Sequence, residues 1–195
     1  MNVSVIKYNA GNIQSVRIAL QRLGLTPTVT DDPEIIRRSD KVIFPGVGEA
    51  SSAMEYLKKR NLDHVLLSLT IPVLGICLGL QLMCHHSEEN DTACLGIFDT
   101  AVRRFPPQNK VPHMGWNTVN NLKGSLFKDI PEKTYVYFVH SYFAEMTSAA
   151  VASTNYILEF ASALEKNNYF AVQFHPEKSQ AAGLKLLQNF VQWNP

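Results

Sequence analysis

Cys77 is the residue whose surroundings most clearly suggest chemistry. Gly75 stands two residues before it and Gly79 two residues after it. The run 72–76 is apolar and β-branched, which is typical of a buried strand, and from Leu78 onward the apolar spacing changes to that of a helix. A cysteine between glycines at a strand-to-helix turn predicts a nucleophile elbow, which exposes the side chain at the carboxyl end of a sheet.

The segment 171–177 supplies a histidine and an acid to accompany this cysteine. It reads as an apolar strand that ends in His175, Pro176 and Glu177, so an imidazole and a carboxylate are held close together. A cysteine, a histidine and an acid, each at a predicted strand end, match the nucleophile, base and orienting group of acyl transfer. The alternative is that Cys77 is a buried structural cysteine, since free cysteines are often buried. The histidine and the acid weigh against that alternative.

Two peptide groups could complete such a site. The glycines of Pro45-Gly46-Val47-Gly48 would let the N–H of Val47 point towards Cys77, and the N–H of Leu78 is free at the start of the helix. Both could receive an oxyanion. The run 45–48 lacks the Lys-Ser/Thr ending of a P-loop and the full G-x-G-x-x-G spacing, so a nucleotide site there is weakly supported.

We expect no metal site and no cofactor. His85 and His86 are adjacent on the helix predicted by the spacing of Leu78, Leu82 and one of these histidines. Consecutive helical side chains point about 100° apart and cannot chelate together as an i, i+4 pair can.

The order of the predicted elements indicates an α/β fold. Strands alternate with helices through the first half of the chain, which predicts a mostly parallel central sheet with helices on both faces. Ligands of such sheets bind beyond the carboxyl ends of the strands. In the second half, turns join the strand-like runs, which predicts an additional antiparallel β layer before a closing helix at about 180–193.

Size and composition narrow the class of protein. The chain has 195 residues, 46% hydrophobic and 18% charged, with a net charge of +1, which fits one domain, residues 1–195, with a substantial core. The charge gives no reason to expect nucleic-acid or membrane binding. Three cysteines without C-x-x-C spacing, and an opening without a signal-peptide pattern, lead us to expect a reducing cytoplasm.

Two segments have the composition of binding surfaces. Pro112 to Asn117 combines Met114, Gly115 and Trp116 in a predicted turn, as interaction surfaces often do. A loop that buries Trp116 in its own core is the alternative. The strand 137–142 ends in polar side chains that could line a pocket or simply terminate the strand.

Together these motifs resemble the class I, or triad-type, glutamine amidotransferases. The resemblance covers nearly the whole chain. Within the family, the chain most resembles the glutaminase subunits of imidazole glycerol phosphate synthase. The family fold implied is the flavodoxin-like α/β fold of class I glutamine amidotransferases. The segments that carry the resemblance are Gly11-Asn12, Pro45 to Gly48, Gly75 to Gln81, Ser87 to Glu89, Pro112 to Asn117, His140 to Tyr142 and Gln173 to Ser179.

The resemblance implies roles for individual residues. The triad would be Cys77, His175 and Glu177, with oxyanion donors at Val47 and Leu78. The residues that would bind L-glutamine are Gly46, Gly48, Gln81, Glu89, Ser141 and Tyr142. The residues expected near a partner are His113, Met114, Gly115, Trp116, Asn117 and Lys178.

The resemblance also implies a partner and a pathway. Similar proteins hydrolyse L-glutamine to glutamate and pass the ammonia to a (β/α)8 cyclase subunit within a heterodimer. The cyclase forms imidazole glycerol phosphate and AICAR in histidine biosynthesis.

Three alternatives stay open. Another triad amidotransferase subunit, such as a sugar-modification paralogue, would share every catalytic residue and differ in its synthase partner. A free-standing hydrolase or peptidase would turn over its substrate without a partner. A non-catalytic binding protein would leave Cys77 unreactive towards a glutamine-like electrophile.

Overall fold

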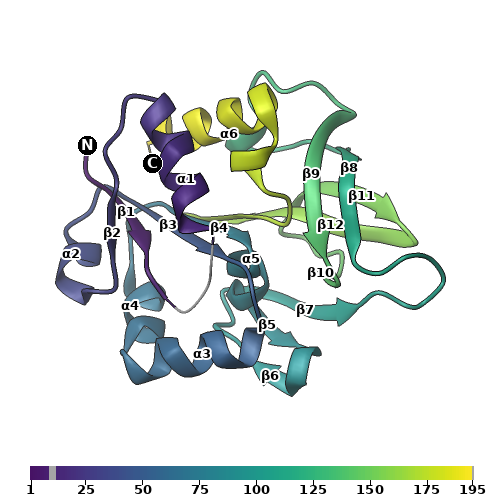
Figure 1. Cartoon of the computed structure of the whole chain (residues 1–195), viewed down its shortest axis with the longest axis horizontal. Helices are drawn as coiled ribbons and strands as arrows, with labels where there is room; N and C mark the ends of the chain where they lie inside the picture. Colours follow the sequence, from purple (N-terminus) through teal and green to yellow (C-terminus); the bar gives the residue numbers. More distant parts are fainter. Residues whose placement is uncertain (9–11, 195) are drawn as a thin grey trace.

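The computed structural model of the protein describes residues 1–8 and 12–194. Gly11 of the predicted Gly11-Asn12 turn therefore lies outside the described residues. Within the described ranges, a sheet of eleven strands crosses the molecule and carries helices on both faces (Figure 1). The predicted α/β fold, a central sheet with helices on both faces, is confirmed.

Five neighbouring strands of this sheet are parallel and form its central part. Their order is β2, β1, β3, β4 and β13. They span Thr28–Thr30 (β2), Val3–Ile6 (β1), Lys41–Gly46 (β3), Val73–Cys77 (β4) and Tyr169–Val172 (β13). Alternate side chains enter opposite cores: Val42 and Phe44 pack on one face of β3 and Ile43 on the other. Burial on both faces explains why β4 and β13 read as continuous apolar runs, whereas the edge strand β2, Thr-Val-Thr, is partly exposed.

The remaining strands continue the same sheet in mixed directions. β12 pairs antiparallel with β13, and β10, β7, β5 and β6 follow in order, while β11 pairs with β12. They span Leu158–Lys166 (β12), Tyr142–Ala144 (β10), Phe98–Arg104 (β7), Cys84–Ser87 (β5), Thr92–Ala93 (β6) and Ala150–Tyr156 (β11). β8 (His113–Val119) and β9 (Thr134–His140) form a separate antiparallel ribbon. Much of the predicted antiparallel layer is thus an extension of the central sheet.

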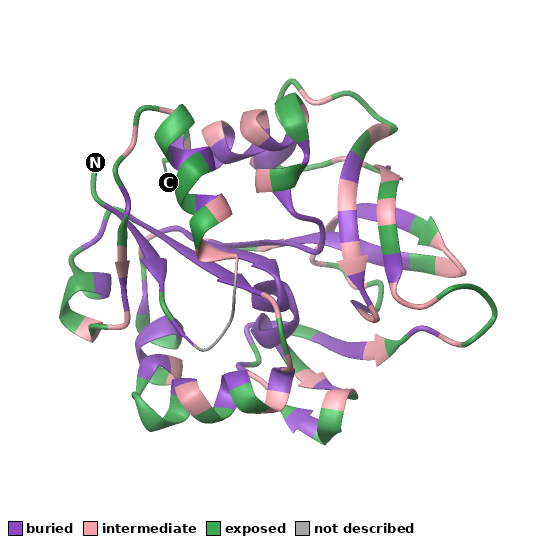
Figure 2. Ribbon diagram, viewed as in Figure 1, coloured by how far each residue is buried: buried purple, intermediate pink, exposed green. Residues whose placement is uncertain are grey.

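The helices divide between the two faces. α1 (Ile13–Arg22) and α6 (Gln180–Gln192) cover one face, and α2 (Pro33–Arg37), α3 (Ala50–Lys59), α4 (Leu62–Ser68) and α5 (Leu78–Met83) cover the other (Figure 1). Figure 2 shows buried residues along the central strands and exposed residues on the outer sides of the helices. Short 3-10 turns lie at Glu89–Asp91 (η1), Ser125–Phe127 (η2) and Pro176–Lys178 (η3). No helix in the described ranges has the length and apolar character needed to cross a membrane.

Two local predictions are wrong. The helix expected to run from Leu78 to His85 or His86 ends at Met83, because residues 84–87 pair as β5 with β7 and β6. The turn expected at 112–117 is mostly strand β8, which pairs with β9 from His113 onward. In both places pairing with a strand that comes later in the chain decides the conformation, and local apolar spacing carries no signal of it.

Candidate active site

The turn at Cys77 has the shape of a nucleophile elbow. Cys77 ends β4 with φ 54° and ψ −105°, a conformation that non-glycine residues seldom adopt, and α5 starts at the next residue. A Cβ at Gly75 would lie 2.8 Å from Met83 Sδ, and a Cβ at Gly79 would collide with the carbonyl oxygen of Phe44. Only glycines on both sides therefore let α5 pack this closely against β3 and β4.

The Pro-Gly-Val-Gly segment lies beside this elbow. β3 and β4 are parallel neighbours in which Gly46 pairs with Cys77, so the residues after Gly46 continue along the edge of the site. Gly46 itself is buried, and a Cβ there would collide with the hydroxyl of Tyr8. Val47 and Gly48 reach the pocket in front of Cys77.

His175 and Glu177 reach the site from β13, the next strand along the sheet. β13 pairs with β4 up to Val172 and Ile76, which places the chain that follows beside the elbow. His175 Nδ1 lies 2.8 Å from Glu177 Oε1, and their side chains are 1% and 0% exposed. Because a carboxylate only accepts, this contact assigns the Nδ1 proton to His175.

The charges around His175 favour the imidazolium. Burial alone would lower the pKa of His175, but the sulfur of Cys77 and the carboxylate of Glu177 outweigh burial and raise that pKa to about 10. Within the described residues, His175 Nε2 has no hydrogen-bond partner, and neither has Glu177 Oε2. The arrangement can thus hold a thiolate beside an imidazolium whose Nε2 proton is available for transfer.

Asn12 is a site residue that sequence reasoning left without a role. Its side-chain Nδ2 donates to Glu177 Oε1, the same oxygen that His175 contacts. Asn12 has φ 72° at the start of α1, a left-handed conformation that asparagine tolerates better than most residues. In the sequence, Asn12 stood out only as part of the Gly11-Asn12 segment that carries the family resemblance. Its contact with Glu177 depends on the packing of α1 against η3, which the sequence did not indicate.

A cavity of about 260 Å³ opens in front of Cys77. Its lining comprises Val47, Gly48, Cys77, Leu78, Gln81, Glu89, Val139 and His140. The structure therefore brings both predicted oxyanion donors and three of the predicted glutamine-binding residues to one small pocket, of a size suited to a compact ligand.

The other predicted glutamine-binding residues lie around this pocket. Gly46 is behind its wall, against Tyr8. Ser141 and Tyr142 are half-buried and follow the pocket residue His140, and the main-chain carbonyl of Tyr142 accepts from Gln81 Nε2 at 2.9 Å.

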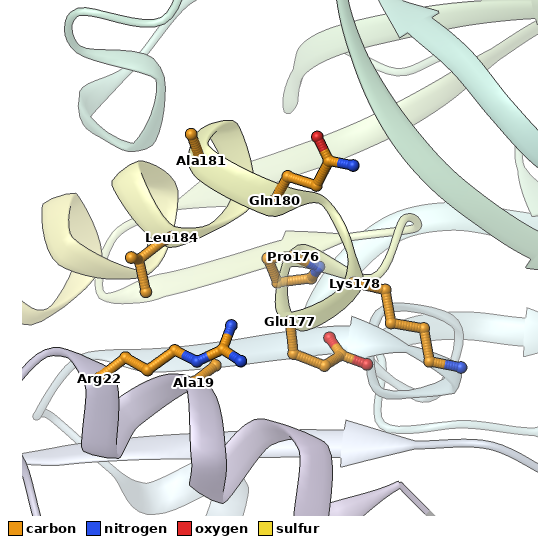
Figure 3. Close-up of a pocket in the computed structure, with 8 residues that line it drawn as sticks. All are labelled: Ala19, Arg22, Pro176, Glu177, Lys178, Gln180, Ala181 and Leu184. Carbon is orange, nitrogen blue, oxygen red and sulfur yellow. The ribbon is translucent and has the colours of Figure 1, made fainter.

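Behind the triad acid lies a second, larger cavity, of about 460 Å³, between α1 and α6 (Figure 3). Glu177 and Lys178 border it from η3, Arg22 from α1, and Gln180 and Leu184 from α6. It shares no lining residue with the Cys77 pocket.

The residues predicted to face a partner divide by orientation. Met114 and Trp116 are 56% and 46% exposed on one side of β8, whereas His113 is only 4% exposed and points inward. Trp116 and the exposed Lys178 both lie against the ring of Tyr137, at 6.0 Å and 5.7 Å from its centroid. Met114, Trp116 and Lys178 thus lie on one exposed face. His113 is buried beneath this face and packs behind β8.

No group of three or more His, Cys, Asp or Glu side chains is placed to hold a metal ion within residues 1–8 and 12–194. His85 and His86 instead lie 3.5 Å from Asp99 and 2.8 Å from Asp91, two different carboxylates.

Comparison with known families gives a match to the model of glutamine amidotransferase class-I over residues 4–193. The chain belongs to the class-I glutamine amidotransferase family. It is accordingly a glutamine amidotransferase enzyme, of a kind that uses a cysteine nucleophile.

Relatives of this amidotransferase are similar to it over nearly its full length. It is 55% identical to imidazole glycerol phosphate synthase subunit HisH of Bacteroides fragilis, over 98% of this chain and 100% of the relative. It is 45% identical, with the same coverage, to the subunit of that name from Yersinia pseudotuberculosis. A solved glutamine amidotransferase from Thermotoga maritima superposes with a TM-score of 0.69 at 17% identity, over 98% of this chain and 96% of that one, which supports the shared fold.

Proposed function

We propose that the amidotransferase is the glutaminase subunit of imidazole glycerol phosphate synthase. In this role it hydrolyses L-glutamine to glutamate and ammonia, and the ammonia passes to a (β/α)8 cyclase subunit. That partner carries out the lyase step that forms imidazole glycerol phosphate and AICAR in histidine biosynthesis. The full-length similarity to subunits of that name supports this assignment.

The observation that carries the chemistry is the placement of Cys77 at a strained elbow beside the His175–Glu177 pair. The Cys77 thiolate attacks the side-chain carboxamide carbon of glutamine and forms a tetrahedral oxyanion. His175 transfers its Nε2 proton to the carboxamide nitrogen, the C–N bond breaks, and ammonia leaves a γ-glutamyl thioester. Neutral His175 then takes a proton from water, whose oxygen attacks the thioester, and the release of glutamate restores the thiolate and the imidazolium. Glu177 holds the imidazole in the required tautomer throughout.

The pocket supplies the remaining groups. The N–H groups of Val47 and Leu78 receive the oxyanion, because both residues border the pocket beside Cys77. Gln81 and Glu89, with Gly46, Gly48, Ser141 and Tyr142 around them, bind the α-amino and α-carboxylate groups of glutamine. Gln81 Nε2 is already engaged with the Tyr142 carbonyl, so its Oε1 is the atom that faces the ligand's ammonium group.

The cyclase docks on the face that includes Met114, Trp116 and Lys178, and the two subunits form a heterodimer. This face lies on β8 and η3, and η3 also carries Glu177. Gly115, Asn117 and the supporting His113 belong to the same strand. The proposed interface therefore adjoins the triad, so that ammonia has only a short distance to travel.

The test is glutamate release from glutamine by the purified chain, alone and with a (β/α)8 cyclase subunit carrying its ribonucleotide ligand. We expect strong stimulation by the partner, and Cys77→Ser should abolish glutamine-dependent synthesis while ammonia-dependent synthesis survives. Full activity without the partner would instead indicate a free-standing hydrolase. Stimulation only by a synthase from another pathway would assign the chain to a paralogue, such as one in sugar modification.

A further inference from the structure

Gln173 lies between Cys77 and Gln81, two residues that line the proposed glutamine pocket, and it follows the last residue of β13. It is fully buried. Its Nε2 donates to Cys77 Sγ at 3.6 Å, and its Oε1 accepts from Gln81 Nε2 at 3.1 Å. A fully buried carboxamide whose two ends both meet site residues is more than a packing element.

We propose that Gln173 is a further catalytic residue, whose side-chain N–H stabilises the thiolate of Cys77 and holds the sulfur in place for attack. The inference rests on the proposed function, in which Cys77 is the nucleophile.

The orientation of the Gln173 amide follows from a fixed acceptor. The main-chain carbonyl of Tyr142 can only accept, so the Gln81 atom 2.9 Å from it must be the nitrogen. The second hydrogen on that nitrogen points to Gln173, which must present its oxygen there. The nitrogen of Gln173 is then the atom left to face Cys77 Sγ.

A second set of hydrogen bonds holds the Tyr142 carbonyl itself. His140 Nδ1 lies 2.7 Å from this oxygen and therefore donates to it. Burial lowers the pKa of His140 to about 3, so its Nε2 is unprotonated and accepts from His113 Nδ1 at 3.0 Å. Burial also lowers the pKa of His113 to about 4, and its Nε2 accepts from Asn117 Nδ2 at 3.3 Å. The donors all run in one direction, from β8 to Tyr142.

Stacked aromatic rings hold this series of hydrogen bonds, from Asn117 through His113 and His140 to the Tyr142 carbonyl, in a fixed geometry. The imidazole of His113 lies between Phe138 and Tyr156, with ring centroids 4.8 Å and 4.1 Å away and interplanar angles of 25° and 16°. Aromatic packing of this kind restricts ring rotation. The Tyr142 carbonyl, and with it the amides of Gln81 and Gln173, is thereby held in one orientation.

The surroundings of Cys77 show why a donor is needed. The sulfur lies 3.9 Å from the carbonyl oxygen of Val139, whose partial negative charge disfavours a thiolate. The N–H of Gln173 offers the opposite partial charge, and hydrogen bonds to an ionised acceptor are the strong ones. The titratable groups that face the sulfur, directly or across the pocket, are His175, Tyr8, Glu89 and His140.

The test compares Gln173→Met, which keeps the length of the side chain, and Gln173→Glu, which replaces the N–H by an acceptor, in the complex with the cyclase. We expect kcat for glutamine hydrolysis to fall about tenfold for the methionine variant and further for the glutamate variant, with less change in KM. The pH at which Cys77 becomes half-reactive towards iodoacetamide should rise by about one unit. Asn189→Leu removes a buried amide of α6 that, among the residues the structure describes, donates to the carbonyls of Leu126 and Lys128 and to no site residue, so this control should lose stability without changing the alkylation profile.

The outcomes separate the two claims. Wild-type complex without glutaminase activity would reject the proposed function, whatever the variants do. Active wild type together with a Gln173→Met variant of unchanged kcat and unchanged alkylation profile would overturn the role of Gln173 alone. A fall in kcat without a shift in the alkylation profile would also overturn it, because loss of packing alone would have that effect.

Discussion

The buried histidine pair makes the stability of the protein depend on pH in a defined direction. Burial lowers the pKa of His113 to about 4 and of His140 to about 3, from an ordinary value of 6.5. A group whose pKa is lowered by folding contributes stability above its unfolded pKa, and this contribution is lost as pH falls towards the folded value. The free energy of unfolding should therefore decrease below about pH 6.5.

The size of this loss follows from the two pKa differences. At pH 5 the unfolded imidazoles are mostly protonated while the folded ones are not, which costs about 2 kcal/mol for each histidine relative to pH 7. Their sum, about 4 kcal/mol, is a large part of the stability of an ordinary domain. The pKa of His175 is raised, so its contribution has the opposite sign: it is full below pH 6.5 and is lost only as pH rises towards 10.

Urea unfolding of the full chain at pH 7 and pH 5 measures this effect. The control is the double variant His113→Phe, His140→Phe, in which non-titrating rings of similar shape occupy the aromatic cluster formed with Phe138. The comparison cancels the contributions of His175 and of the carboxylates. We expect the wild type to lose about 4 kcal/mol more than the double variant between the two pH values. Equal losses would refute the assignment of two neutral histidines in the folded state.

Three further predictions concern the elbow and the triad. Gly79→Ala should destabilise the protein by about 3 kcal/mol or prevent folding, because its Cβ meets the carbonyl of Phe44; a thermal midpoint equal to that of the wild type would contradict this packing. Glu177→Gln should lower the pKa of His175, measured by imidazole NMR, and reduce kcat about 10⁴-fold, as loss of the orienting acid does in other triads; an unchanged imidazole titration would count against the pair. Asn12→Gly keeps the left-handed backbone accessible but removes the donor to Glu177, so kcat should fall about tenfold; activity at the wild-type level would show that this contact is dispensable.

The sequence was most informative where local patterns carry the chemistry. The glycines around Cys77 are required by close packing at Gly75 and Gly79, as their spacing suggested. The alternation of strands and helices predicted the central sheet, because helices that connect parallel strands pack on the faces of that sheet. The exposed side chains of Met114 and Trp116 agree with the composition of their segment as a surface.

Features that depend on distant pairing were not predictable in this way. β5 and β8 are strands because β7 and β9 lie beside them, and their own residues gave a helical or turn-like pattern. Asn12 and Gln173 are amides, a side-chain type that is common throughout proteins, and only the folded arrangement shows that one meets Glu177 and the other Cys77. The inward orientation of His113 likewise depends on rings from β9 and β11.

The position of β13 in the sheet has a consequence for biosynthesis of the protein. β13 lies between β4 and β12, and its Ala171 pairs with Gly75, about a hundred residues earlier in the chain. During translation, the edge of β4 therefore stays open until residues 169–177 have left the ribosome, and such unpaired edges favour aggregation. Until that moment Cys77 also has neither His175 nor Glu177 beside it. A nascent chain therefore has no complete Cys-His-Glu triad. The triad is assembled in the same step in which β13 pairs with β4.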